Sequence, residues 1–118
     1  MKNETHNDNS EITECLQAFN RTLGTEWALE QCYDIDVLAS LTIKGQHLKV
    51  GMEFKRQVRR SMVAQLHDRL EFYRGHSGIP VIICTEYVDP KMAMLLKDSG
   101  IQFLDLAGNA YLNSGNIF

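Results

Sequence analysis

Three side chains between residues 36 and 55 have the types and spacing needed for phosphodiester chemistry: Asp36, Glu53 and Lys55. Two carboxylates can hold Mg²⁺, and a neighbouring lysine can position an attacking water or help to deprotonate it. The triplet Glu-x-Lys also occurs by chance in many strands with exposed salt bridges. The chemistry therefore depends on whether the fold brings Asp36 to this triplet.

The segments 34–43 and 47–55 alternate between apolar and polar side chains, which predicts two strands of a hairpin. A two-residue loop at Lys44-Gly45 keeps the two apolar faces together, with glycine supplying the positive φ of a primed turn. The resulting pairs are Ile35 with Phe54, Val37 with Met52 and Leu41 with Leu48.

The same register sets Asp36 directly opposite Glu53 on the polar face and Asp34 opposite Lys55. Two carboxylates that face each other are unfavourable by some tenths of a kcal/mol up to about 1 kcal/mol. A bound cation would reverse the sign of that interaction. The alternative interpretation is an exposed salt bridge between Asp34 and Lys55, in which case this face carries only surface electrostatics.

The rest of the chain indicates one α/β (α+β) domain over residues 11–118, after a polar tail over residues 1–10 that we expect to be disordered. Strand, helix, strand order predicts a crossover between parallel strands and hence a central mixed sheet that contains the antiparallel hairpin. Segment 25–31 fits a strand or a continued helix, and its alternation favours the strand. The other predicted elements are helices near 11–23, 57–74 and 90–97 and strands at 81–84, 101–106 and 110–112, with a loop at 75–80, Asp89 as N-cap and a turn at Gly108-Asn109.

The predicted helix 57–74 has an apolar stripe that should pack on the sheet. Gln65 and Arg69 lie one turn apart at the edge of that stripe. They could flank the carboxylate cluster if the helix lies beside the hairpin. The alternative is a solvated helix edge with no role in a site.

Charge is distributed unevenly along the chain. The net charge of -3 argues against a protein that coats nucleic acid generally, but residues 44–60 hold six of the 12 Lys and Arg residues against one acid. These residues therefore form a local basic patch, although the net charge of the chain is negative. Besides Lys55, its members are the predicted nucleic-acid-binding residues Lys44, Lys49, Arg56, Arg59 and Arg60.

Cysteine usage and hydropathy indicate a cytoplasmic protein. The three cysteines are widely spaced and have no CxxC pattern, which fits reduced thiols. No apolar run approaches membrane-spanning length, and the N-terminal residues have no hydrophobic signal region. We expect neither secretion nor membrane insertion.

Asp36 with Glu53-Phe54-Lys55 resembles the D…(D/E)-x-K signature of the PD-(D/E)XK nuclease superfamily. More specifically, residues 11–118 are similar to bacterial proteins grouped with AbiEi-type antitoxins of type IV toxin–antitoxin systems. The segments that carry this second resemblance are MEFKRQ, AQL, VIICTEYVDP and GIQFLDLAGNAYL, and FLDLAGNAYL is the most specific of them.

The resemblance implies a restriction-endonuclease-like fold, in which a helix, three antiparallel strands, a helix and a further strand follow one another. It implies that Asp36 and Glu53 bind Mg²⁺ or Mn²⁺, that Lys55 lies near the attacking water, and that Gln65 is an accessory residue. A helix acid, Glu11 or Glu14, would be a further member. The implied partners are DNA, a cognate toxin and a winged-helix region that continues a longer chain. Because the sequence has no other basic cluster, we expect these residues alone to bind DNA weakly. A homodimer is one alternative for the assembly.

Three hypotheses follow from these observations. The chain is a Mg²⁺-dependent DNA nuclease domain, a non-catalytic nuclease-like module of a transcriptional regulator or antitoxin, or a scaffold domain with a surface salt bridge. The first two are favoured nearly equally. They differ in whether an intact set of site residues also performs catalysis.

Overall fold

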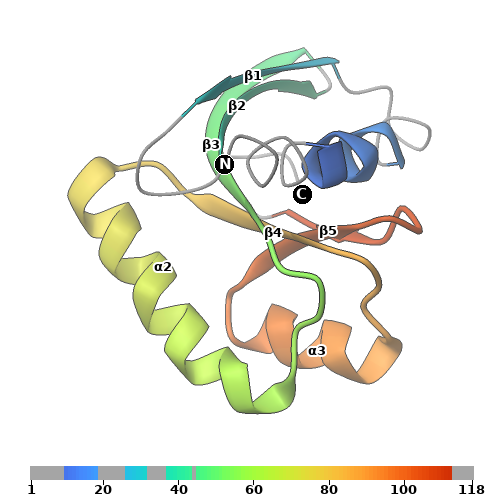
Figure 1. The fold of residues 1–118 in the computed structure, drawn as a ribbon. Coiled ribbons are helices and arrows are strands. Elements are labelled where there is room, and N and C mark those ends of the chain that lie inside the picture. Colours follow the sequence, from blue (N-terminus) through green and yellow to red (C-terminus); the bar gives the residue numbers. More distant parts are fainter. Residues whose placement is uncertain (1–9, 19–25, 32–36, 44, 113–118) are drawn as a thin grey trace, which may run out of the picture.

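A computed structural model of the chain describes residues 10–18, 26–31, 37–43 and 45–112 (Figure 1). These residues form a six-stranded sheet in the order β1-β2-β3-β4-β5-β6. The first three strands and the β5–β6 pair are antiparallel, whereas β3, β4 and β5 are parallel. The strands are β1 Glu26–Gln31, β2 Val37–Ile43, β3 Gln46–Phe54, β4 Val81–Thr85, β5 Gln102–Asp105 and β6 Ala110–Tyr111. The predicted α/β class and mixed sheet are confirmed.

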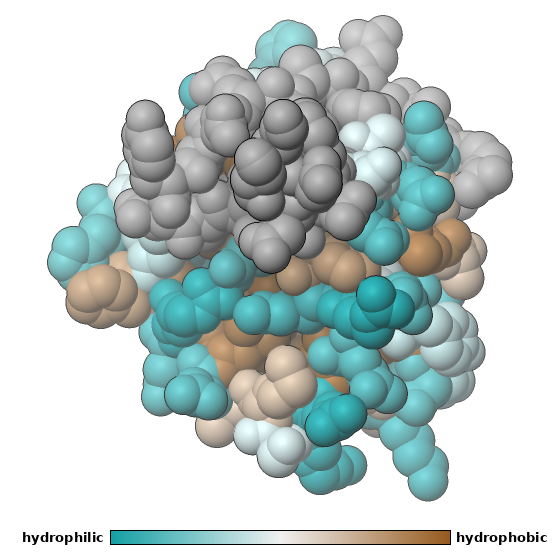
Figure 2. Space-filling view, in the orientation of Figure 1, coloured by the Kyte–Doolittle hydropathy of each residue, from teal (hydrophilic) through white to brown (hydrophobic). Residues whose placement is uncertain are grey.

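Helices cover both faces of this sheet. Residues 10–18 are helical and lie on one face, while α2 (Val63–Ser77) and α3 (Pro90–Asp98) lie on the other (Figure 1). Over α2 and α3, hydrophilic side chains alternate with smaller apolar areas (Figure 2). Within the described residues, no helix is both long enough and apolar enough to cross a membrane.

The hairpin register follows the prediction where both strands are described. Val37 pairs with Met52 and Leu41 with Leu48, and Gly45 has a φ of 80° in the connecting turn. Asp36, and with it the predicted pairing to Glu53, lies outside the described residues, as do Asp34, Ile35 and Lys44. The even residues of β3 therefore face one core, and its odd residues face the other side of the sheet.

Two apolar cores lie on the two faces of the sheet. The core under helix 10–18 contains Ile12, Cys15, Leu16, Val37, Ala39, Leu41, Val50, Met52, Ile82, Cys84, Leu104 and Leu112. The core under α2 and α3 contains Val58, Val63, Leu66, Leu70, Val81, Ile83, Val88, Leu96, Ile101 and Phe103. Successive β4 residues alternate between these cores, so the strand is buried on both faces. This explains its wholly apolar sequence.

The predicted helix 57–74 is wrong at both ends. A 3-10 turn, η1, covers Arg60–Met62, and α2 begins only at Val63. The chain before it continues beside β4: the Lys55 N–H donates to the Cys84 carbonyl at 2.8 Å, and the Thr85 hydroxyl donates to the Arg56 carbonyl at 3.0 Å. These long-range hydrogen bonds hold Lys55 and Arg56 beside β4, so the helix begins later in the chain.

The C-terminal end of α2 lies three residues beyond the predicted one. Gly75, the predicted start of a loop, is inside the helix, and Gly78 ends it with a φ of 74° and an N–H bonded to the Arg74 carbonyl at 2.7 Å. Glycine adopts this left-handed conformation without the steric cost of a side chain. Gly78 rather than Gly75 is therefore the C-cap glycine.

The other described elements agree with the predictions. Segment 26–31 is a strand, so the strand interpretation of this region is confirmed. Asp89 caps α3 by accepting a hydrogen bond from the Met92 N–H at 2.8 Å, and Pro90 occupies the first helical position. The predicted helix 11–23 is confirmed over residues 11–18, and residues 19–23 lie outside the described part of the chain.

Candidate functional site

Glu53 lies near the end of β3, on the face of the sheet that α2 covers. Its side chain is only 12% exposed, and it forms an ion pair with Arg69 of α2, whose side chain is 43% exposed. A carboxylate with so little solvent needs a positively charged or hydrogen-bonding partner. Arg69 satisfies that need in this structure.

An open hollow of about 250 Å³ lies beside this ion pair, between the end of β3 and the first turns of α2. The side chains that line it are Lys55, Met62, Gln65, Leu66 and Arg69. Leu66 is buried in the core, so it fixes the position of Gln65 and Arg69 on the flank of the helix. The structure therefore brings Glu53, Lys55, Gln65 and Arg69 together, as expected if the helix lies beside the hairpin.

The described charges at this site favour an anion over a cation. Lys55 and Arg69 are both cationic, and the one described carboxylate, Glu53, already has an arginine partner. Within the described part of the chain, no group of three or more His, Cys, Asp or Glu side chains could hold a metal ion. A divalent cation here would need Asp36, which lies outside the described residues, and would have to share or replace Arg69 at Glu53.

The predicted nucleic-acid-binding residues are divided between two places. Arg56, Arg59 and Arg60 lie in the segment between β3 and α2, whereas Lys49 lies near the start of β3. A rise of about 3.3 Å per residue puts Lys49 roughly 20 Å from Arg56 along the strand direction. Lys44 lies outside the described residues.

Each of these arginines is exposed, and two have polar partners. Arg56 forms an ion pair with Glu86 at 3.2 Å, and Arg59 donates to the Gln57 side-chain oxygen at 3.3 Å. Exposed pairs of this kind contribute little stability, so they leave both arginines able to contact a phosphate. The helix acids Glu11 and Glu14 lie on the opposite face of the sheet, on helix 10–18 (Figure 1).

The segment FLDLAGNAYL contains a buried acid that the sequence interpretation missed. Asp105 is fully buried at the end of β5. One carboxylate oxygen accepts the N–H groups of Ala107 (3.0 Å) and Asn109 (2.9 Å), and the other accepts the Val88 N–H and the Asn109 side-chain amide, both at 2.9 Å. The sequence offered one signal for this buried acid: it lies between two leucines and is followed closely by Gly-Asn. This motif builds a loop, which agrees with the prediction of a turn at Gly108-Asn109.

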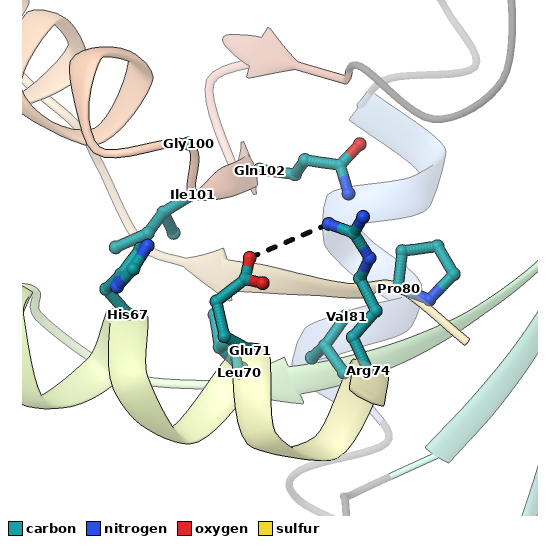
Figure 3. Close-up of a pocket in the computed structure, with 9 residues that line it drawn as sticks. All are labelled: His67, Leu70, Glu71, Arg74, Pro80, Val81, Gly100, Ile101 and Gln102. Carbon is teal, nitrogen blue, oxygen red and sulfur yellow. Dashed lines mark ion pairs between the residues drawn. The ribbon is translucent and has the colours of Figure 1, made fainter. Parts of the chain in front are cut away.

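A second hollow lies on the other flank of α2, against the first residues of β4 and β5 (Figure 3). Glu71 and Arg74 form an ion pair across part of it at 3.6 Å. Its volume of about 30 Å³ suits a water molecule rather than a nucleotide. We assign the candidate site to the Lys55 hollow, because the predicted site residues Lys55 and Gln65 line it.

No protein-family model, curated protein or solved structure matches this chain. The resemblance to PD-(D/E)XK nucleases and to AbiEi-type antitoxins thus stays a prediction from the sequence motifs.

Proposed function

We propose that this chain is a nuclease-like domain that acts on DNA and hydrolyses phosphodiester bonds with the help of Mg²⁺ or Mn²⁺. The observation that supports this proposal best is the convergence of Glu53, Lys55 and Gln65 at the hollow between β3 and α2. The order of the described elements also fits: a helix, three antiparallel strands, a helix and a further strand.

Each residue at the hollow has a role in this proposal. Asp36 and Glu53 would hold the cation, which supplies Lewis-acid stabilisation of the phosphoryl oxygens. Lys55 would hold the attacking water or a phosphoryl oxygen through its ammonium group. Gln65 would orient the same group with its amide, and Arg69 would donate to a non-bridging phosphate oxygen.

A second candidate function is a non-catalytic, DNA-binding module of a regulator or antitoxin. The Glu53–Arg69 ion pair favours this alternative, because it neutralises a carboxylate that a cation would need. In such a module Lys55 and Arg69 would contact the DNA backbone directly. The two candidates make opposite predictions for added metal.

Thermal unfolding with and without Mn²⁺ tests the nuclease proposal. A cation at ten times its Kd stabilises the folded state by about 1.4 kcal/mol, which corresponds to a rise in Tm of roughly 5 °C for a domain of this size. Asp36→Asn and Glu53→Gln should each abolish the rise. Glu86→Gln is the matched control, since Glu86 is an arginine-paired carboxylate outside the hollow, and it should keep the full response.

Lys55→Ala then separates catalysis from cation binding. In a nuclease this variant should keep the Mn²⁺ response and lose cleavage of a labelled DNA, while Lys91→Ala, which removes an exposed lysine of α3, should cleave normally. A wild-type protein that neither responds to Mn²⁺ or Mg²⁺ nor cleaves DNA would exclude the nuclease and leave the non-catalytic module.

A further inference from the structure

The flank of α2 that borders the Lys55 hollow extends along the whole helix. At 100° per residue, Gln65, Arg69, Phe72 and His76 point within about 60° of one another. We call these four residues the α2 flank. The apolar residues Leu66 and Leu70 lie beside it and are buried, so the direction of the flank is fixed by the core.

Phe72 and His76 form an exposed aromatic surface on this flank. Phe72 is 67% exposed although it is a large apolar residue. Its ring lies against the His76 imidazole, with centroids 4.1 Å apart and planes inclined by 38°. The His76 Nδ1 donates to the Phe72 carbonyl at 3.0 Å, because a carbonyl oxygen can only accept, and this bond holds the imidazole beside the phenyl ring.

Arg69 connects this aromatic surface to the candidate site. It lines the Lys55 hollow and also a neighbouring hollow of about 490 Å³, whose other members are Phe72, Tyr73, His76 and Ser77. Its guanidinium has five N–H donors, so contact with Glu53 leaves donors for a second acceptor. A ligand that occupies both hollows must pass Arg69.

Gly75 leaves open space on the surface of α2, one turn after Phe72. A Cβ at this position would meet nothing within 4 Å, and the residue lies inside α2, so neither packing nor a turn requires glycine here. Glycine inside a helix lowers stability by about 1 kcal/mol relative to alanine. A ligand that lies against the Phe72 ring would therefore meet no side chain at this position.

We propose that the α2 flank binds an unpaired nucleotide of a single-stranded nucleic acid, with the base stacked on Phe72 and His76 and a phosphate at Arg69. Exposed aromatic rings combined with cationic side chains are the usual means of holding single strands without sequence preference. Both neighbouring acids have partners: Asp68 contacts the His67 ring at 3.3 Å, and Glu53 is paired with Arg69. A duplex hides its bases in the stack and cannot offer one to Phe72.

This inference rests on the proposed function. It assumes that the same nucleic-acid strand continues from the α2 flank to the Lys55 hollow, where its next phosphate would lie. It narrows the substrate class to single strands, or to duplexes with unpaired ends. Fluorescence anisotropy with a labelled dT12 oligonucleotide and a hairpin duplex of equal length tests it. The wild-type protein should bind dT12 more tightly than the duplex.

Substitutions at Phe72 decide whether stacking is the cause of that preference. Phe72→Ala should weaken dT12 binding at least about fivefold, whereas Phe72→Trp should retain it. Met94→Ala is the matched control, since Met94 is an equally exposed apolar residue on α3. The affinity of this variant for dT12 should stay within about twofold of wild type. Melting curves of all variants check that the fold is intact.

The possible failures are distinguishable. If the wild-type protein binds dT12 and the duplex equally, or if Phe72→Ala binds dT12 normally, the inference is wrong and a DNA-acting function stands. If the wild-type protein binds neither nucleic acid, both proposals fail. If it self-associates and Phe72→Ala restores the monomer, the flank is a protein interface and the inference is overturned.

Discussion

The buried carboxylate of Asp105 should be essential for the loop between β5 and β6. Each of its oxygens accepts two hydrogen bonds, from Val88 and Asn109 on one side and from Ala107 and Asn109 on the other. Asp105→Asn keeps the shape but replaces one oxygen with an NH₂ group, which cannot accept. Two donors therefore lose their acceptor in either orientation of the amide.

The size of this effect follows from the number of bonds lost. A hydrogen bond to a charged acceptor contributes about 1.5–3 kcal/mol, so two contribute about 3–6 kcal/mol. At least one of the two lost donors is only partly buried, so we expect the lower part of that range, a fall in the free energy of unfolding of roughly 3–4 kcal/mol. For a domain of this size the corresponding fall in Tm is roughly 10–15 °C. Urea unfolding followed by circular dichroism would measure the change in free energy directly.

Asp98→Asn is the control for a change of charge alone. Asp98 is exposed at the C-terminal end of α3, where a negative charge is slightly unfavourable, so this variant should stay within about 0.5 kcal/mol of wild type. If Asp105→Asn also remained within about 1 kcal/mol of wild type, the four hydrogen bonds would not be what holds the loop.

Two further predictions concern the helices beside the sites. Gly75→Ala should raise the free energy of unfolding by about 0.5–1 kcal/mol, because alanine favours the helix and its Cβ meets no neighbour; a destabilised variant in urea unfolding would contradict the open space seen there. Asp89→Ala should lower the free energy of unfolding by about 1 kcal/mol, because it removes the side-chain cap on Met92, and Asp89→Ser should restore most of that loss.

Local patterns were sufficient to predict most of the sheet. The alternation around Val37 and Met52 determines which face of each strand is buried, and Gly45 determines where the chain turns. The apolar run 81–84 identifies a strand buried on both faces. Asp89-Pro90 marks the start of α3 because capping and a fixed φ are local properties.

The boundaries of α2 could not be predicted in this way. Residues 57–59 have no local signal against a helix. The residues just before them, Lys55 and Arg56, are held beside β4 by hydrogen bonds with Cys84 and Thr85, which are more than 25 residues away. Likewise, both Gly75 and Gly78 could end a helix, and only Gly78 has a positive φ. Tertiary contacts decide between options that local preference leaves equal.

Only the local part of the candidate site could be predicted from the sequence. The period of the strand places Glu53 and Lys55 on one face, which the sequence shows. The contact between Glu53 and Arg69 depends instead on where α2 lies on the sheet, and that position is set by Leu66 and Leu70 in the core. One of the four bonds of Asp105, from the Val88 N–H, likewise joins β5 to the residues before α3, and no local pattern predicts such a contact.

The Glu53–Arg69 ion pair lies between the proposed cation site and the α2 flank. Glu53 cannot leave the site, because Met52 and Phe54 on either side of it pack with the opposite core. Arg69 can move more easily, because it is half-exposed and on a long, flexible side chain. Any cation at Glu53 would weaken the hold of that carboxylate on Arg69, and the freed guanidinium lies between Lys55 and the Phe72 surface. A cation would compete with Arg69 for Glu53, and a phosphate would compete with Glu53 for Arg69. Each ligand therefore frees the residue that the other one needs, so binding of the cation and of the nucleic acid should be mutually favourable.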